Sequence, residues 1–311
     1  MTYLTHDRRI VFDTPSGMKT SVHRTSWPPD RPPLTVQSGV AWHYTSLGAL
    51  DSIVRGQELW ATNWRATNDS SEFRHGIGFL EDAWTALEHG GEVDERTLAL
   101  LAEAGPIEDY VEYFDDVHIM CAARERDSPY QWNSYAGGSD GVALALDLRM
   151  PLVTDVDDRP RRRGDAELFG IQWLKVIYSE RQKRLAAARF VREMNEDVRD
   201  GKEVTVQTLV ALNVLTALNF KHHGFRHERE TRCVALCAGV DLLHMPQTPE
   251  KTIVPWKGSP GFGETKHRPL PIAEVMIGPR TPPEAAGRVR EAFLSSSLQG
   301  VPVTRSSLPF R

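Results

Sequence analysis

The stretch HIMCAARERDSPYQWNSYAGGSDGVALAL, residues 118–146, decides the class of fold that we expect. It begins and ends with short apolar runs, at 118–123 and 142–146, and turn-forming residues bound each run. Apolar runs of this length with such boundaries are typical of buried β-strands. The sequence therefore predicts a sheet that is formed, in part, by the middle of the chain.

The segment between the two runs, residues 127–138, combines aromatic rings with amide and hydroxyl groups. Its Ser128, Trp132 and Tyr135 are the kinds of side chain that stack on a planar heterocycle and hydrogen-bond to its edges. The same composition fits a capped helical turn whose rings pack on the sheet. Both interpretations stay open at the level of sequence.

Strands and helices follow one another irregularly on either side of this segment. Toward the N-terminus, capping residues and apolar periodicity predict one strand and then three helices, at 40–45, 47–56, 71–87 and 95–103. Toward the C-terminus, the pattern predicts strands at 174–178, 232–236 and 275–277 and helices within 179–222 and 283–294. Because regular β-α alternation is missing, we expect a mixed α+β fold.

The domain organisation is expected to be simple. Residues 1–38 are rich in Pro, Ser and Thr, which predicts an extended arm. Residues 39–311 are then expected to form a single domain with helical insertions.

The bulk composition excludes several classes of protein. The chain has 311 residues and a formal net charge of -5, which is too small to draw the whole molecule toward nucleic acid or an anionic membrane. Three cysteines without metal-ligand spacing predict buried thiols in a reducing compartment. No stretch has the pattern of a signal peptide or a membrane helix. We therefore expect a cytoplasmic protein with no membrane partner and no bound metal.

The first candidate site residue is His43, within the run Trp42-His43-Tyr44-Thr45. It stands at the end of an expected strand, immediately before a helix, and functional groups often occupy strand ends. A histidine in a strand can equally be a structural residue with satisfied hydrogen bonds.

The second candidate is the pair Glu228 and Glu230, followed by Arg232. If a strand begins here, its period of two places all three charges on one face. Three charges at the mouth of an apolar strand are costly to bury unless a ligand uses them. The alternative is a solvated edge-strand face on which Arg232 bridges the two acids.

A basic run contains Arg159, Arg161, Arg162 and Arg163. Its guanidinium groups could bind phosphate, so a nucleic acid stays open as a partner. Such a run is more often a surface loop.

Several of these motifs occur together in an order that resembles a widespread bacterial domain family of unknown function. The resemblance covers roughly residues 40 to 295. It is carried by these residues: His43-Tyr44-Thr45, Asn68-Asp69 with Glu72, Ser128-Pro129 with Trp132 and Tyr135-Ala136, Lys221 with Phe225, Glu228-x-Glu230-x-Arg232 and Ile277-Gly278-Pro279. That family in turn resembles ADP-ribosyltransferases, because a His, a middle aromatic residue and a late Glu follow in the same order.

The resemblance implies an ADP-ribosyltransferase-like split mixed β-sheet core with flanking helices, and NAD as the substrate. It implies that His43 holds a ribose hydroxyl and that Tyr135 or Trp132 stacks on nicotinamide. Glu230 would stabilise the oxocarbenium-like ribose and Glu228 would orient the acceptor, although the pattern alone does not distinguish the two. The remaining residues expected to bind NAD are Thr45, Asn68, Ser128, Lys221 and Arg232.

The function expected from this resemblance is NAD-consuming: transfer of ADP-ribose to a protein or nucleic-acid acceptor, or hydrolysis of NAD. A role as a toxin or antiphage effector would suit such chemistry. Two alternatives remain open. One is a nucleotide-binding or interaction module without turnover. The other is a metal-dependent nuclease or hydrolase with Asp69, Glu228 and Glu230 as oxygen ligands.

Overall fold

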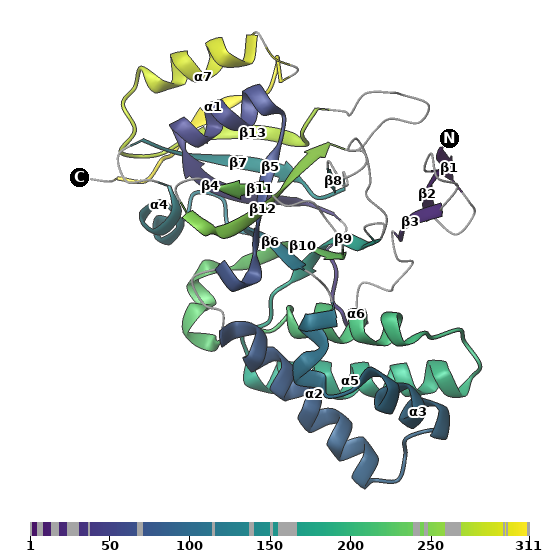
Figure 1. Ribbon diagram of the computed structural model, residues 1–311. Coiled ribbons are helices and arrows are strands. Elements are labelled where there is room, and N and C mark those ends of the chain that lie inside the picture. The colour runs from purple at the N-terminus through teal and green to yellow at the C-terminus, as the bar shows by residue number, and fades with distance from the viewer. Residues whose placement is uncertain are drawn as a thin grey trace.

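Figure 1 shows the fold of the protein in a computed structural model. The residues it describes are 2–4, 9–13, 19–23, 31–36, 38–66, 71–113, 116–136, 140–149, 152–154, 167–238, 243–245, 248–258, 269–294, 296 and 298–309. Asn68, Asp69 and the arginines at 159–163 lie outside these residues. The fold is α+β, as the order of sequence patterns predicts: a twisted sheet with short helices at one side and a helical layer at the other.

An open, mixed sheet forms the centre of the molecule. Its strands are β4 Val40–Ser46, β5 Leu59–Asn63, β6 Asp116–Ala123, β7 Gly141–Asp147, β8 Leu152–Thr154, β9 Glu167–Lys175, β10 Glu230–Ala238, β11 Leu243–Met245, β12 Thr248–Gly258, β13 Ile272–Ile277 and β14 Val303–Arg305. The main path runs β11-β12-β5-β6-β4-β7-β13-β14, while β10 pairs with β6 and β9, and β8 pairs with β12. The sheet is mixed because β13 and β14 are parallel, whereas the other described pairs are antiparallel.

The sheet divides along one edge of β6. On that edge Ala123 pairs with Trp42 of β4, whereas His118 and Ile119 pair with β5. The three residues between these points, 120–122, pair with β10 on the other edge but with neither β4 nor β5. The two neighbouring strands therefore diverge here and leave a gap beside the middle of β6.

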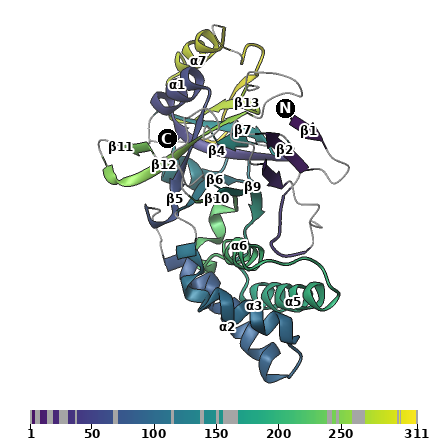
Figure 2. The same cartoon turned by 45° about the vertical axis from the view of Figure 1, so that its right-hand side comes forward.

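A helical layer packs below the sheet in Figures 1 and 2. It consists of α2 Ser71–His89, α3 Glu95–Ala104, α5 Glu180–Arg199 and α6 Val206–Ala217, with the 3₁₀ turns η1 Trp64–Ala66 and η2 Ile107–Tyr113. Residues of α6 are buried all around its axis, which explains why this helix is apolar on every face. Its core continues into the sheet through Ile119, Leu174 and Val234.

A second core lies on the other side of the sheet, beneath α1 Leu47–Gly56 and α7 Ala285–Leu294 (Figure 1). Ser46 caps α1, since its side chain accepts a hydrogen bond from the backbone N–H of Ala49. None of the described helices has a stretch long and apolar enough to span a lipid bilayer.

The N-terminal residues contain more structure than the expected arm. Three described strands, β1 Thr2–Leu4, β2 Arg9–Asp13 and β3 Lys19–His23, form a small antiparallel sheet. Residues 31–36 then run along β9, where the Val36 N–H donates to the Trp173 carbonyl at 2.7 Å. This segment satisfies backbone groups of β9 that β10 does not reach, so residues 31–36 belong to the packed domain.

Candidate functional site

A pocket of about 500 Å³ opens at the division of the sheet. Its floor is the middle of β6, and its walls come from β4, β5, the start of α2, the short helix α4 Pro129–Tyr135, the 3₁₀ turn η4 His223–Glu228 and the start of β10. Aromatic rings dominate the walls, and charged groups gather at one side: the lining includes Trp42, His43, Tyr44, Trp60, Trp64, Glu72, Phe73, Cys121, Tyr130, Gln131, Tyr135, Lys221, Phe225, Glu228, Glu230 and Arg232. A pocket of this volume and composition is typical of small-molecule sites.

His43 reaches across the gap between β4 and β6. Its Nδ1 lies 3.0 Å from the carbonyl oxygen of Cys121. A carbonyl can only accept a hydrogen bond, so Nδ1 carries the proton and Nε2 is left as an acceptor. Burial lowers the pKa of His43, and the Cys121 carbonyl offsets this only in part. The ring is therefore neutral, with an acceptor nitrogen available to a ligand.

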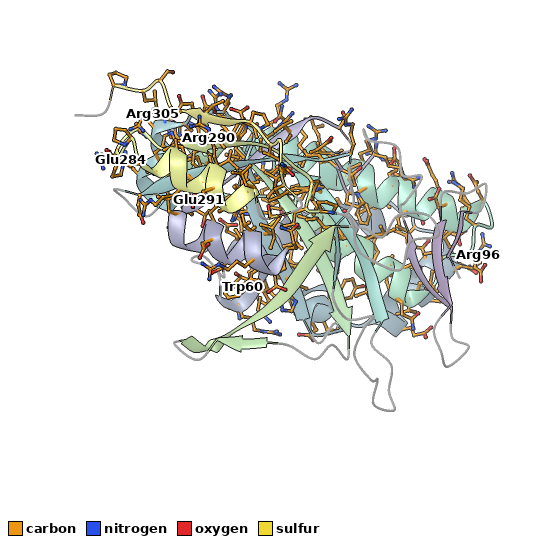
Figure 3. The ribbon with its side chains drawn as sticks, turned by 90° about the horizontal axis from the view of Figure 1, so that it is seen from above. Trp60, Arg96, Glu284, Arg290, Glu291 and Arg305 are labelled. Atoms are coloured by element: carbon orange, nitrogen blue, oxygen red, sulfur yellow. The ribbon has the colours of Figure 1, made fainter. Side chains whose placement is uncertain are left out.

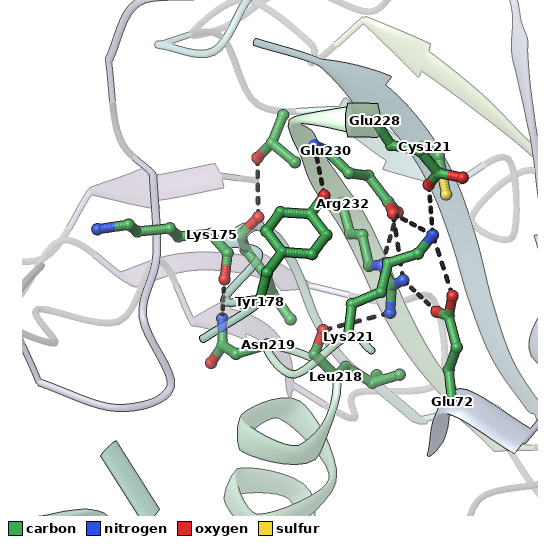
Figure 4. A network of polar contacts seen from close by, with 12 residues as sticks. Glu72, Cys121, Lys175, Tyr178, Leu218, Asn219, Lys221, Glu228, Glu230 and Arg232 are labelled. Carbon is green, nitrogen blue, oxygen red and sulfur yellow. Dashed lines mark hydrogen bonds and ion pairs between the residues drawn. The ribbon is translucent and has the colours of Figure 1, made fainter. Parts of the chain in front are cut away.

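Glu230 is the centre of a buried ionic network (Figure 4). Arg232 donates through Nε to its Oε1 at 2.6 Å and through Nη2 to its Oε2 at 3.2 Å. Lys221 donates to the same Oε2 at 2.8 Å. Arg232 also forms an ion pair with Glu72 of α2. The Lys221 Nζ lies 3.0 Å from Oε1 of the same Glu72. Helix α2 and residues 221–232, which are far apart in the sequence, thus meet through two cations.

Glu228 joins this network from the end of η4. Its Oε2 accepts from Lys221 at 2.5 Å, and its Oε1 accepts from the Tyr135 hydroxyl at 3.0 Å. Its backbone carbonyl accepts from the Gln131 side-chain amide at 2.8 Å. Helix α4 therefore positions both the backbone and the carboxylate of Glu228.

The ionic states follow from burial and from neighbouring charges. Burial alone would raise the pKa of Glu230, but the charges of Arg232 and Lys221 outweigh it and lower that pKa to about 2. Burial would lower the pKa of Lys221, but the carboxylates, led by Glu230, raise it above its ordinary value. Glu230 and Lys221 are both ionised at neutral pH. With three carboxylates and two cations, the cluster carries a formal charge of -1.

Cys121 lies on the pocket floor, where part of its surface is open to the pocket. Burial and then the Glu230 charge raise the pKa of its thiol well above the usual value. The thiol therefore stays protonated. A protonated thiol is a poor nucleophile.

The charged pair does not lie on an exposed edge, which was the alternative interpretation of the Glu-x-Glu motif. Strand β10 is paired with β6 on one side and with β9 on the other. Glu228 and Glu230 are 5% and 4% exposed. One expectation is corrected: β10 begins at Glu230, so Glu228 does not share a strand face with it. Arg229 between them has a left-handed backbone, φ 44°, and this turn brings the two carboxylates to Lys221.

The C-terminal segment holds α4 against the sheet. Asp127, just before α4, accepts from the Trp132 indole N–H at 2.8 Å and from the Ser306 hydroxyl at 2.6 Å. The Ser307 backbone N–H donates to the other Asp127 oxygen at 3.0 Å. Asp127 thus connects α4 with the C-terminal segment and fixes the helix that carries Tyr135.

The pocket brings together six of the residues that the sequence singled out: His43, Tyr135, Lys221, Glu228, Glu230 and Arg232. Three others lie elsewhere among the described residues. Trp132 is buried and packs edge-on against Tyr44, with ring centroids 4.8 Å apart. Ser128 is buried at the start of α4, and Thr45 does not line the pocket. Asn68 lies outside the residues that the structure describes.

Sequence reasoning missed Glu72, Cys121 and Trp60 as site residues. Glu72 matched a helix-capping pattern, which concealed its role as a partner of Lys221 and Arg232. Trp60 is 45% exposed on a strand that the sequence pattern does not predict. The exposure of Trp60 is known only from the structure, so no sequence signal indicated it.

A comparison with known families gives one match. Residues 131–233, roughly a third of the chain, match the model of a family described as a protein of unknown function (DUF2971). The matched segment contains Tyr135 and the whole group Lys221, Glu228, Glu230 and Arg232, whereas His43 and Glu72 precede it. Searches of curated proteins and of solved structures return no match.

Proposed function

We propose that the pocket binds NAD and cleaves its nicotinamide–ribose bond, so that the protein is a cytoplasmic ADP-ribosyltransferase or NAD glycohydrolase with an ADP-ribosyltransferase-like fold. One observation carries this proposal. His43, Tyr135 and the Glu228–Glu230 pair come from segments far apart in the chain, and all line one pocket at the division of the sheet. The sequence order that resembles ADP-ribosyltransferases requires this convergence.

The chemistry of the walls supports a ligand with a positively charged aromatic ring. Aromatic faces attract cations, and the ionic cluster behind them carries a formal charge of -1. The nicotinamide ring of NAD is such a cation and is already a good leaving group. Cleavage then needs stabilisation of an oxocarbenium-like ribose more than it needs a general acid.

The experiment is to incubate the purified chain with NAD and measure free nicotinamide over time. We expect release by the wild type and loss of at least about 100-fold in rate when Glu228→Gln and Glu230→Gln are combined. Glu103→Gln, on the exposed face of α3, is the matched control and should keep the wild-type rate. Absence of release with water, and of ADP-ribose transfer to any protein or nucleic acid offered, would contradict the proposal.

A second candidate function has one observation in its favour. Each carboxylate of the cluster already has an internal cation as a partner, which is a stable arrangement for a binding module without turnover. Stabilisation of the fold by NAD with no nicotinamide released would favour this candidate.

Metal-dependent hydrolysis is less well suited to the same carboxylates. A divalent ion would have to compete with Lys221 and Arg232 for their oxygens. Loss of activity with a chelator and recovery with magnesium would instead support this mechanism.

A further inference from the structure

The two glutamates of the pair differ in how many hydrogen bonds their carboxylates already accept. A carboxylate offers about four lone-pair directions. Glu230 receives two donors from Arg232 and one from Lys221. The protein itself therefore occupies three of the roughly four lone-pair directions of Glu230.

Glu228 has more unused capacity than Glu230. Its two oxygens accept one hydrogen bond each, from Tyr135 and from Lys221. About half of its lone-pair directions therefore remain for other donors. Its carboxylate also lies beside Tyr135, whose side chain is 41% exposed at the end of α4.

The partners of Glu228 can also be exchanged at little cost. Lys221 keeps Glu72 and Glu230 as partners at 3.0 and 2.8 Å if it leaves Glu228. The Tyr135 hydroxyl can turn to water because the ring is half-exposed. By contrast, Arg232 is 3% exposed, and the loss of Glu230 would leave its Nε without a partner in the described network. Unpaired buried charges are strongly destabilising.

We propose that Glu228 is the carboxylate that contacts the substrate ribose, while Glu230 is a positioning residue that holds Lys221 and Arg232. This assignment rests on the proposed function and reverses the division of roles that the resemblance implies.

In hydrolysis, the bond between the nicotinamide nitrogen and C1′ of ribose breaks, and its electron pair leaves with neutral nicotinamide. Glu228 stabilises the resulting cation and accepts a hydrogen bond from a ribose hydroxyl. A water oxygen then bonds to C1′ and gives its proton to Glu228, which releases it to solvent. The products are ADP-ribose, nicotinamide and a proton.

The test compares Glu228→Gln, Glu230→Gln and the control Glu103→Gln by two measurements. In thermal unfolding without NAD, we expect Glu228→Gln to shift the midpoint by about 2 °C or less, and Glu230→Gln to lower it by roughly 5 °C or more. In nicotinamide release, we expect kcat to fall by about 100-fold or more in Glu228→Gln. Glu230→Gln should keep a kcat within about tenfold of the wild type, because its charge acts only through neighbours.

The pH dependence of kcat distinguishes a positioning role of Glu230 from a general destabilisation of the fold. Glu230→Gln removes a negative charge next to Glu228, so the acid limb of kcat should move to lower pH. A purely structural defect would leave that limb where it is. If Glu230→Gln does not fold, Glu228→Gln still decides the matter by its kcat.

The assignment is overturned if Glu228→Gln is folded and retains wild-type kcat, or if Glu230→Gln has an unchanged midpoint and no activity. Both outcomes need an active wild type, so the proposed function survives them. A wild type that neither releases nicotinamide nor transfers ADP-ribose overturns the proposed function, whether or not NAD stabilises it, and the assignment falls with it.

Discussion

His118, on β6, is a fully buried histidine whose two ring nitrogens have no hydrogen-bond partner in the described structure. Burial lowers its pKa to about 4. A ring with such a pKa is neutral throughout the range in which most proteins are studied. The residue lies two positions from the pocket floor, so its protonation would disturb the strand that carries Cys121.

His118 should make the fold sensitive to acid. The unfolded chain binds a proton near pH 6.5, whereas the folded ring does not until about pH 4, so stability is complete above pH 6.5 and is lost as the pH falls toward 4. The loss amounts to about 3 kcal/mol at pH 4. We expect His118→Leu, of similar volume and with no polar atom, to remove this part of the pH dependence. Urea unfolding of both proteins at several pH values between 7 and 4 measures it, and parallel curves would contradict the expectation.

Some site residues could be predicted from the sequence because they are polar groups near the ends of expected strands. His43 and the Glu228–Glu230 pair are visible in this way, and they do line one pocket. The geometry that joins the pair was not predictable. A strand would have aligned the carboxylates by its period of two, whereas the left-handed turn at Arg229 aligns them through Lys221. Local pattern does not indicate a turn made by a non-glycine residue.

Helix α2 carries Glu72 into the network, and its packing against α6 depends on a glycine. A Cβ built on Gly76 would lie 2.3 Å from the carbonyl oxygen of Ala217, a distance that real Cβ atoms do not adopt. The two helix backbones can approach closely only because Gly76 has no side chain. Glu72 is one turn earlier on the same helix, so the approach also sets its distance to Arg232.

Gly76→Ala should therefore push α2 away from α6. We expect a loss of about 1–3 kcal/mol in the free energy of unfolding, measured by denaturant titration, together with reduced NAD cleavage. Gly78→Ala on the same helix is the matched control, since no atom lies within 4 Å of the position that its new methyl group would take. The control should stabilise the protein by roughly 0.5–1 kcal/mol because alanine favours helix. Equal effects of the two substitutions would refute the close-packing argument.

Elements with clear end signals were predicted well, and elements without them were not. The helix expected at 47–56 is α1 Leu47–Gly56, bounded by the Ser46 cap and by Gln57 in a left-handed conformation. The strand expected at 174–178 is instead β9 Glu167–Lys175, because the chain turns after Lys175 so that Ile177 pairs with Phe220. Strands β5, β8, β11, β12 and β14 were not predicted; β5 and β8 depend on pairing with β12, which is distant in the sequence.

At the scale of the whole molecule, the pocket lies where separate cores meet. Phe73 and Ile119 belong to the core of the helical layer, whereas Met120 and Ala122 belong to the core beneath α1 and α7. No composition or periodicity indicates this meeting point, because it arises from the divergence of β4 and β5 along β6. A ligand in the pocket would contact residues of both cores and so stabilise the packing of one core against the other.

This arrangement predicts where NAD should slow backbone amide exchange. The short elements α4 and η4 contribute Tyr135 and Glu228 to the pocket, so local unfolding of either element disrupts the site. NAD at 100 times its Kd should therefore slow amide exchange in both elements by up to about 100-fold. Helices α3 and α7 supply no lining residue and serve as internal controls; Arg96 on α3 and Glu291 on α7 lie at opposite ends of the molecule in Figure 3. Exchange followed by mass spectrometry with and without NAD measures the effect. Slower exchange only in α3 or α7 would show that NAD binds outside the pocket. Slower exchange in both α4 and η4 would show that one bound NAD stabilises the two segments together.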